Sequence, residues 1–252
     1  MKKIIICIII FIAAFLTGSF FIYKNNSKII IKELSFEKHW FVLYIQDKNT
    51  NIIFDTGNCR KNFLKSLKKN NVDIKQAKYI LISHKDYDHS NGLLDLKKED
   101  LSPKTKVVIN NDVLKGITES YGKDTIKNIN IINPVDNFYI NRNIIYTKTL
   151  LGIAETHGKQ WGIQESFLII KKHNKLTIIS GCAHPGIIEM VEYAKKITGC
   201  DKINAVVGGL GVIGEKEARY LNDTKADIYP IHCTEYKEGS LLKVKKMPLV
   251  IK

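Results

Sequence analysis

Six consecutive residues, His84-Lys85-Asp86-Tyr87-Asp88-His89, constrain this chain more than any other feature of its sequence. They follow the apolar run Tyr79-Ile80-Leu81-Ile82, which is typical of a buried strand. Imidazole nitrogens and carboxylate oxygens are the ligands of zinc and of harder first-row ions. The spacing places the first histidine and aspartate on one side and the second pair on the other. It therefore predicts a site with two metal ions, which favours hydrolysis as the reaction. The alternative to a metal site is a solvated polar turn between strand and helix.

The composition suits a globular catalytic domain with a basic surface. The chain has 252 residues, of which 44% are hydrophobic, so it is long enough for a sizeable core in one domain or at most two. Its formal net charge is +14; residues 1–27 contribute three lysines and no acid, which leaves +11 for the remainder. Such a charge favours anionic partners, including phosphoester substrates and nucleic acid. The lysine pairs are scattered along the chain, which indicates a diffuse basic surface rather than a nucleic-acid groove.

The first 23 residues predict a membrane segment. An uncharged run over residues 4–23 follows Lys2 and Lys3 and is long enough to cross a hydrocarbon core. The two lysines favour a cytoplasmic start. We expect residues 1–23 to be an uncleaved anchor, residues 24–28 a linker, and residues 29–252 a domain outside the cytoplasm. Small residues within the run leave open a cleaved signal peptide and secretion.

The order of the remaining elements predicts an α/β sandwich. Strand patterns dominate the first part of the chain, and helical patterns separate the later strands. Strands are predicted over residues 29–34, 40–46, 51–54, 79–82, 107–109, 129–132, 138–149, 166–170, 175–180, 203–207 and 228–231. Helices are predicted over residues 62–69, 112–119, 187–197 and 215–221, with a helix or turn through 93–96. Two facing sheets with helices outside would bring the ends of several strands to one edge.

Further candidate site residues follow predicted strands. Asp55 is expected to hold a neighbouring histidine in position, with a turn aspartate as the alternative. His184 and His232 each end a strand and are predicted metal ligands. Cys182 is close enough in sequence to approach a metal as thiolate, although packing as a small buried residue is favoured. His157 lies in the predicted loop 155–162, where it suits substrate contact, metal ligation or simple exposure equally.

Together these segments resemble the metallo-β-lactamase superfamily, and in particular the branch named for dihydropterin-ribofuranosyl-aminobenzene-phosphate synthase. The matching segments, in the family's order, are residues 53–57 (IFDTG), 81–93 (LISHKDYDHSNGL), 181–187 (GCAHPGI), 207–210 (VGGL) and 230–234 (PIHCT). The resemblance implies a four-layer αβ/βα sandwich with one or two divalent metals, usually zinc, at one edge of the sheets.

Carried over by position, the resemblance assigns metal ligands in two sets. The two sets are His84, Asp86 and His184, and Asp88, His89 and His232. The chain departs from the family where Asp86 replaces a histidine, a form similar to lactamase-like domains of DNA-uptake membrane proteins. An oxygen ligand there admits manganese or iron beside zinc. In a second departure, Leu210-Gly211 stands in place of Phe-His, so the resemblance does not assign the branch's substrate to this chain.

The main hypothesis is a metal-dependent hydrolase. Water activated by the metals would attack an ester or phosphoester, with Asp88 as both ligand and orienting group. The first alternative is an extracytoplasmic nuclease, motivated by Asp86 and the basic charge. The second is a non-catalytic metal-binding domain of the cell envelope.

Overall fold

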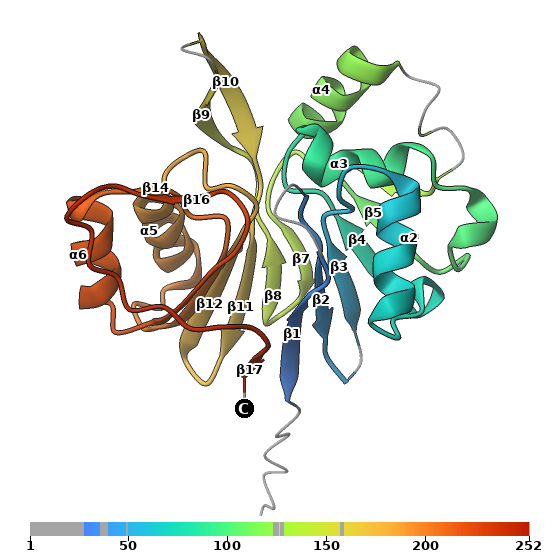
Figure 1. Ribbon diagram of the computed structural model, residues 1–252. Coiled ribbons are helices and arrows are strands. Elements are labelled where there is room, and N and C mark those ends of the chain that lie inside the picture. Colours follow the sequence, from blue (N-terminus) through green and yellow to red (C-terminus); the bar gives the residue numbers. More distant parts are fainter. Residues whose placement is uncertain are drawn as a thin grey trace, which may run out of the picture.

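Two β-sheets face each other and carry helices on their outer faces, giving four layers (Figure 1). The structure is a computed structural model that describes residues 28–35, 40–48, 50–122, 126, 129–156 and 159–251. The predicted four-layer αβ/βα sandwich is confirmed. The predicted membrane anchor and most of the linker lie outside the described residues. Among the helices that the structure does describe, none has the length and apolar character to cross a membrane.

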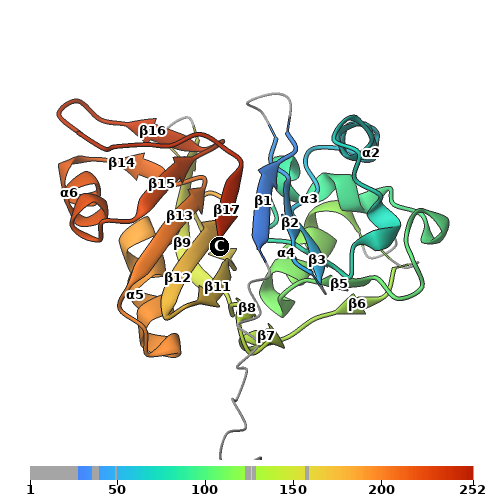
Figure 2. The ribbon, with the colours of Figure 1, turned by 90° about the horizontal axis from the view of Figure 1, so that it is seen from below.

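The first sheet has seven strands in the order β17-β1-β2-β3-β4-β5-β6. They are β1 (Ile29–Glu33), β2 (Leu43–Gln46), β3 (Asn51–Phe54), β4 (Tyr79–Leu81), β5 (Lys106–Val108), β6 (Ile131–Ile132) and β17 (Leu249–Ile251). The strands from β3 to β6 pair in parallel, so their carboxyl ends share one edge. The C-terminal strand β17 crosses over to pair antiparallel with β1, between the two halves of the molecule (Figure 2).

The second sheet has six strands in the order β15-β13-β12-β11-β8-β7. They are β7 (Phe138–Asn141), β8 (Ile144–Tyr146), β11 (Leu168–Lys172), β12 (Lys175–Ser180), β13 (Ile203–Gly208) and β15 (Asp227–Pro230). Strands β12, β13 and β15 run parallel, so the loops after β12 and β15 emerge at the same edge.

Helices cover both outer faces. On the first sheet lie α2 (Arg60–Lys69), α3 (Tyr87–Leu94) and α4 (Asn111–Tyr121), and on the second lie α5 (Ile187–Thr198) and α6 (Glu215–Asp223) (Figure 1). Helix α5 buries Ile187, Met190, Val191 and Ala194, the i, i+3, i+4, i+7 pattern of an amphipathic helix. It ends at Gly199, whose φ of 62° is the left-handed conformation that closes a helix.

Three apolar clusters hold the layers together. One lies between the sheets and includes Phe41, Phe54, Tyr146 and Leu168. The other two lie between each sheet and its helices. Because apolar residues of the central strands are buried on both faces, the strands appear in the sequence as nearly continuous apolar runs.

Two small strand pairs extend beyond the sandwich. Strands β9 (Leu150–Thr156) and β10 (Lys159–Glu165) form a hairpin that projects from one end of the molecule (Figure 1). The sequence interpretation of residues 155–162 as a loop was therefore wrong for the part that the structure describes. Strands β14 (Gly211–Ile213) and β16 (Thr234–Tyr236) pair in parallel.

Candidate metal centre

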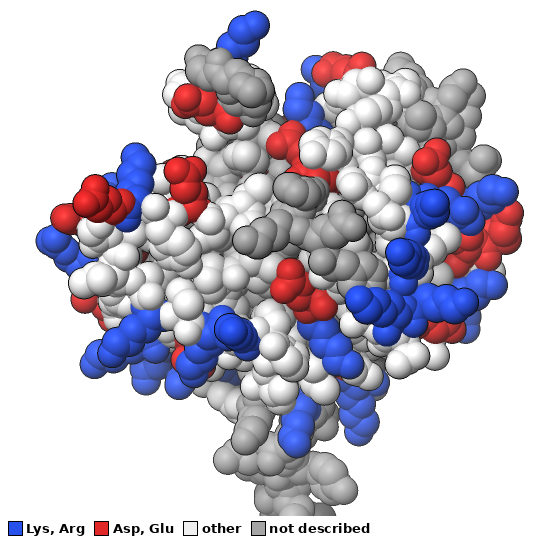
Figure 3. All heavy atoms as spheres, viewed as in Figure 1, with Lys and Arg blue, Asp and Glu red and all other residues white. Residues whose placement is uncertain are grey.

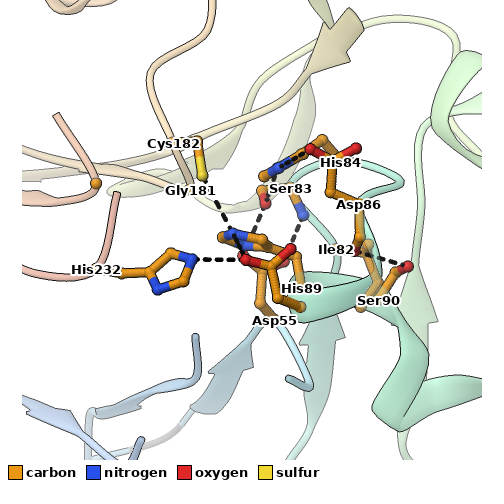
Figure 4. Close-up of polar contacts among 12 residues, drawn as sticks. Asp55, Ile82, Ser83, His84, Asp86, His89, Ser90, Gly181, Cys182 and His232 are labelled. Carbon is orange, nitrogen blue, oxygen red and sulfur yellow. Dashed lines mark hydrogen bonds and ion pairs between the residues drawn. The ribbon is translucent and has the colours of Figure 1, made fainter. Parts of the chain in front are cut away.

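The candidate site lies where the carboxyl ends of strands from both sheets meet. Asp55 follows β3, the 83–89 segment follows β4, Cys182 and His184 follow β12, and His232 follows β15. Figure 4 shows that the side chains of Asp55, His84, Asp86, His89, Cys182 and His232 converge on one region. Of the candidates named from the sequence, only His157 lies outside the described residues. That these side chains bind metal stays a prediction.

The first cluster contains His84, Asp86 and His184. Oδ2 of Asp86 lies 3.6 Å from Nε2 of His84 and 3.7 Å from Nε2 of His184. Both imidazole nitrogens are buried and, within the described part of the chain, have no hydrogen-bond partner. Two donors about 2.1 Å from one ion in tetrahedral directions lie about 3.4 Å apart. These separations are too long for hydrogen bonds and fit donors around one cation.

The charges of the first cluster are interdependent. Burial would raise the pKa of Asp86, but the neighbouring His84 and His184 outweigh it and lower that pKa. Burial lowers the pKa of His184, and the nearby His84 lowers it further. The aspartate is therefore ionised and the histidine neutral near pH 7, which are the protonation states that metal ligands need.

The second cluster contains Asp88, His89 and His232. Nε2 of His232 lies 2.8 Å from Oδ2 of Asp88, and Nε2 of His89 lies 3.8 Å from the same oxygen. Burial disfavours the charged forms of Asp88 and His232, but the hydrogen bond between them, together with the neighbouring charges, has the larger effect. It lowers the pKa of Asp88 to about 2 and raises that of His232 to about 9. In this arrangement the two side chains form an ion pair.

Two thiols lie beside the second cluster. Sγ of Cys182 lies 3.2 Å from Nε2 of His89, and a hydrogen bond joins Cys182 to Cys233. That bond holds the pKa of Cys233 well below its ordinary value and raises the pKa of Cys182. Cys182 also lies within 4.8 Å of donor atoms of His84 and His184, so its sulfur stands between the two clusters. Cys182 is buried, as predicted, and its sulfur also lies among the candidate ligands.

Asp55 and Ser83 fix the orientation of the buried histidines. Oδ2 of Asp55 accepts hydrogen bonds from the Ser83 hydroxyl at 2.7 Å and from Nδ1 of His89 at 2.8 Å. Its Oδ1 accepts the backbone N–H of Ser83 at 2.7 Å, and the Ser83 hydroxyl also lies 2.8 Å from Nδ1 of His84. Contacts at Nδ1 direct both Nε2 atoms toward the candidate metals. Sequence reasoning identified Asp55 but missed Ser83.

Glu165 holds the loop after β12, and sequence reasoning missed it entirely. The side chain is fully buried. Oε1 accepts the backbone N–H groups of Gly181, Cys182 and Ala183 at 3.0, 3.0 and 3.2 Å. Oε2 accepts the N–H of His184 at 2.8 Å. One carboxylate thereby positions two candidate ligands.

Three site loops contain a non-glycine residue in the left-handed conformation. The φ angles are 63° at Asp55, 55° at Ala183 and 45° at His232. This conformation is unfavourable for residues with a Cβ atom and persists where the surroundings impose it. Because this conformation recurs in three loops of one site, we infer that the surrounding fold imposes it and thereby sets the directions of the neighbouring site side chains.

A cavity of about 760 Å³ opens beside the candidate ligands. His184, His232 and both thiols line its inner end. The hairpin supplies Ile153 and Glu155, and the β14–β16 pair supplies Val212 and Glu235. Among the described residues, no lysine or arginine lines it. On the face drawn in Figure 3, most basic side chains lie along the lower edge and the right flank.

Comparisons with known proteins agree with this geometry. Residues 40–122 match the family model described as the metallo-beta-lactamase superfamily. An uncharacterized protein of Methanocaldococcus jannaschii, MJ0448, is 26% identical over 83% of this chain and 91% of its own. The 7,8-dihydropterin-6-methyl-4-(beta-D-ribofuranosyl)-aminobenzene-5'-phosphate synthase of the same organism is 26% identical over 75% of this chain and 77% of its own.

A solved structure of similar fold is Tm1679, described as a metal-dependent hydrolase of the β-lactamase superfamily. It superposes with a TM-score of 0.62 at 21% identity, covering 89% of this chain and 98% of its own. The match of residues 40–122, the sandwich fold and the order of the strand-end motifs make this chain similar to the metallo-β-lactamase superfamily, with the dihydropterin synthase as a distant homologue.

Proposed function

We propose that the protein is a metal-dependent hydrolase of esters or phosphoesters. The observation that carries this proposal is the pair of buried, unpartnered Nε2 atoms of His84 and His184 on either side of the Asp86 carboxylate. Unsatisfied buried nitrogens cost free energy unless something binds them, and a divalent cation suits this donor set. His84, Asp86 and His184 would hold one ion, and His89 with His232 the other.

The residues around these donors suit hydrolysis. Bound divalent metals would supply Lewis acidity that lowers the pKa of water and polarises the scissile carbonyl or phosphoryl oxygen. The ionised carboxylate of Asp88 lies beside the histidines of the second cluster, His89 and His232, where it would orient the attacking water and accept its proton. Asp55 and Glu165 keep the surrounding groups in place and exclude water from their own contacts.

The cavity lining favours a substrate with an apolar portion and little negative charge. Ile153 and Val212 offer apolar contacts, whereas Glu155 and Glu235 repel anions. The nuclease alternative requires a basic groove along the backbone of the nucleic acid, and the lining residues do not provide one. We therefore favour uncharged esters and lactones, followed by phosphodiesters with an apolar substituent.

The test is a substrate screen on the full chain loaded with zinc, manganese or iron. Neutral esters, lactones, phosphodiesters and single-stranded DNA are compared at equal concentration. We expect turnover of one of the first three classes and its loss in His84→Ala and in Asp88→Ala. His173→Ala is the control, because His173 lies at the distant β11–β12 turn. Full activity in both site variants contradicts the mechanism, and metal binding without any turnover supports the non-catalytic alternative.

We also propose that residues 1–23 anchor the domain at a membrane, facing away from the cytoplasm. The support is the uncharged run after Lys2 and Lys3. Protease added to intact expressing cells should then degrade the domain, while the chain sediments with membranes. A protease-resistant chain in the soluble fraction of lysed cells contradicts this proposal.

A further inference from the structure

We propose that Cys233 is a metal ligand and that it completes, with Cys182, His89 and His232, a four-coordinate site selective for zinc. One donor atom from each of these four residues lies within 4.8 Å of every other. Zinc–sulfur and zinc–nitrogen bonds of about 2.3 and 2.0–2.1 Å place tetrahedral ligands roughly 3.4 to 3.8 Å apart. Small side-chain rotations therefore suffice to bring all four onto one ion.

The backbone explains how neighbouring residues reach the same ion. In an extended chain, successive side chains point to opposite faces, so His232 and Cys233 would diverge. The left-handed φ of 45° at His232 interrupts the extended path directly after β15. The opposing ligand Cys182 is held by its N–H bond to Glu165, and His89 by its bond to Asp55. The backbone conformation of His232, the hydrogen bond to Glu165 and the hydrogen bond to Asp55 thus position these donors.

The donor atoms of the proposed zinc site differ from those of the first cluster, and so does the metal that each prefers. His84, Asp86 and His184 offer nitrogen and oxygen, which zinc, manganese and iron all accept. Two thiolates favour zinc over manganese strongly, because manganese prefers oxygen donors. The centre would then hold zinc at the thiolate position whichever ion occupies the other.

Four protein ligands also change the role of Asp88. Its carboxylate lies 2.8 Å from Nε2 of His232, the same nitrogen that zinc would take. Zinc at the thiolate position would displace Asp88 from that hydrogen bond. The freed carboxylate would stay beside His89, 3.8 Å from its Nε2, where it could accept a proton in the proposed hydrolysis. The inference rests on the metal centre of the proposed function but not on hydrolysis itself.

Cobalt(II) loading tests the inference through a readout that is independent of activity. Thiolate-to-cobalt charge transfer gives a near-ultraviolet absorption band whose intensity rises with the number of thiolate ligands. The full chain, reduced and loaded with cobalt, should show this band. We expect Cys233→Ser to halve its intensity and Cys182→Ser with Cys233→Ser to abolish it. Cys200→Ser is the control, because its thiol contacts the Asn174 carbonyl away from the site.

Zinc affinity gives the second measurement, by competition with a chromogenic chelator. Cys233→Ser should lose at least tenfold in affinity for one zinc per chain. Cys233→Asp should retain a metal there, lose half the cobalt band and accept manganese more readily. An unchanged band and zinc affinity in Cys233→Ser overturn the inference, even if the protein hydrolyses esters. A halved band in a chain that hydrolyses nothing supports it while contradicting the proposed function.

Discussion

Oδ2 of Asp55 lies 2.8 Å from Nδ1 of His89, and both side chains are fully buried. Since an ionised carboxylate only accepts hydrogen bonds, Nδ1 of His89 is the donor and its ring orientation is fixed. Nε2 then points toward Cys182 and Asp88, where a metal is expected. A residue 34 positions away in sequence therefore sets the geometry of a candidate ligand.

Replacing Asp55 should weaken metal binding without removing a ligand. Asp55→Asn keeps the shape but places an amide against Nδ1 of His89 and against the Ser83 hydroxyl. We expect a loss of about 10- to 100-fold in affinity for one metal, as orienting partners of ligating histidines typically contribute. Chelator competition measures it. The control is Asp73→Asn, because the exposed side chain of Asp73 accepts the N–H of Lys75 far from the site; its metal affinity should be unchanged.

The positions of the candidate ligands were predictable because each follows a buried strand that appears in the sequence as a nearly continuous apolar run. The β9–β10 hairpin was not, because it has little core to bury: Leu151 and Ile153 are 67% and 64% exposed. The buried side of β9 carries only the small residues Gly152 and Ala154, so its sequence lacks the alternation of large apolar residues inside that marks a strand. Glu165 escaped notice for another reason. Its partners are backbone N–H groups 16 to 19 residues away, and no side-chain pattern marks them.

Cys233 lies next to the candidate ligand His232 in the sequence, but the direction of its side chain could not be predicted. Its thiol follows His232 directly, and in a regular strand the two side chains would face opposite ways. The signal that places it in the site is the left-handed φ of His232, which a sequence does not reveal. Composition also does not reveal where the basic residues lie: the described residues that line the cavity include no lysine or arginine.

Replacing Glu165 should lower both the free energy of unfolding and the metal affinity of the first cluster. Glu165→Gln keeps an oxygen but turns an NH₂ group toward backbone N–H donors, so at least one of the four bonds to residues 181–184 is lost. We expect a decrease of about 2–4 kcal/mol in the free energy of unfolding, since the bonds are buried and charge-assisted. Denaturant titration measures it. Metal affinity should fall as well, through His184. A variant with wild-type stability shows that the loop does not depend on this carboxylate.

The metal-free protein should lose stability as the pH rises above neutrality. The folded pKa of His232 is about 9 against an ordinary 6.5, so its contribution is complete below 6.5 and disappears as the pH passes 9. The folded pKa of Asp88 is about 2 against an ordinary 3.8, so its contribution disappears only as the pH falls through that range. We expect a loss on the order of 2 kcal/mol between pH 6.5 and 9. Denaturant titration with a chelator present measures it. His232→Gln should flatten this dependence, and an equally steep decline in that variant excludes the Asp88–His232 pair as its cause.

Gly152 in β9 should tolerate no side chain, because the strand backbone passes directly against His184. A Cβ atom at Gly152 would lie 2.2 Å from the His184 carbonyl carbon, and the next residue, Ile153, donates its N–H to that carbonyl at 3.3 Å. Gly152→Ala must therefore push the hairpin away from the candidate ligand. We expect a loss of about 1–3 kcal/mol in stability and a weaker first metal, measured by denaturant titration and chelator competition. The matched control is Gly162→Ala on β10, where the new Cβ would meet only the exposed Leu151 side chain at 3.3 Å. If Gly152→Ala and Gly162→Ala have the same stability and the same metal affinity, the contact between the hairpin and His184 does not position this candidate ligand.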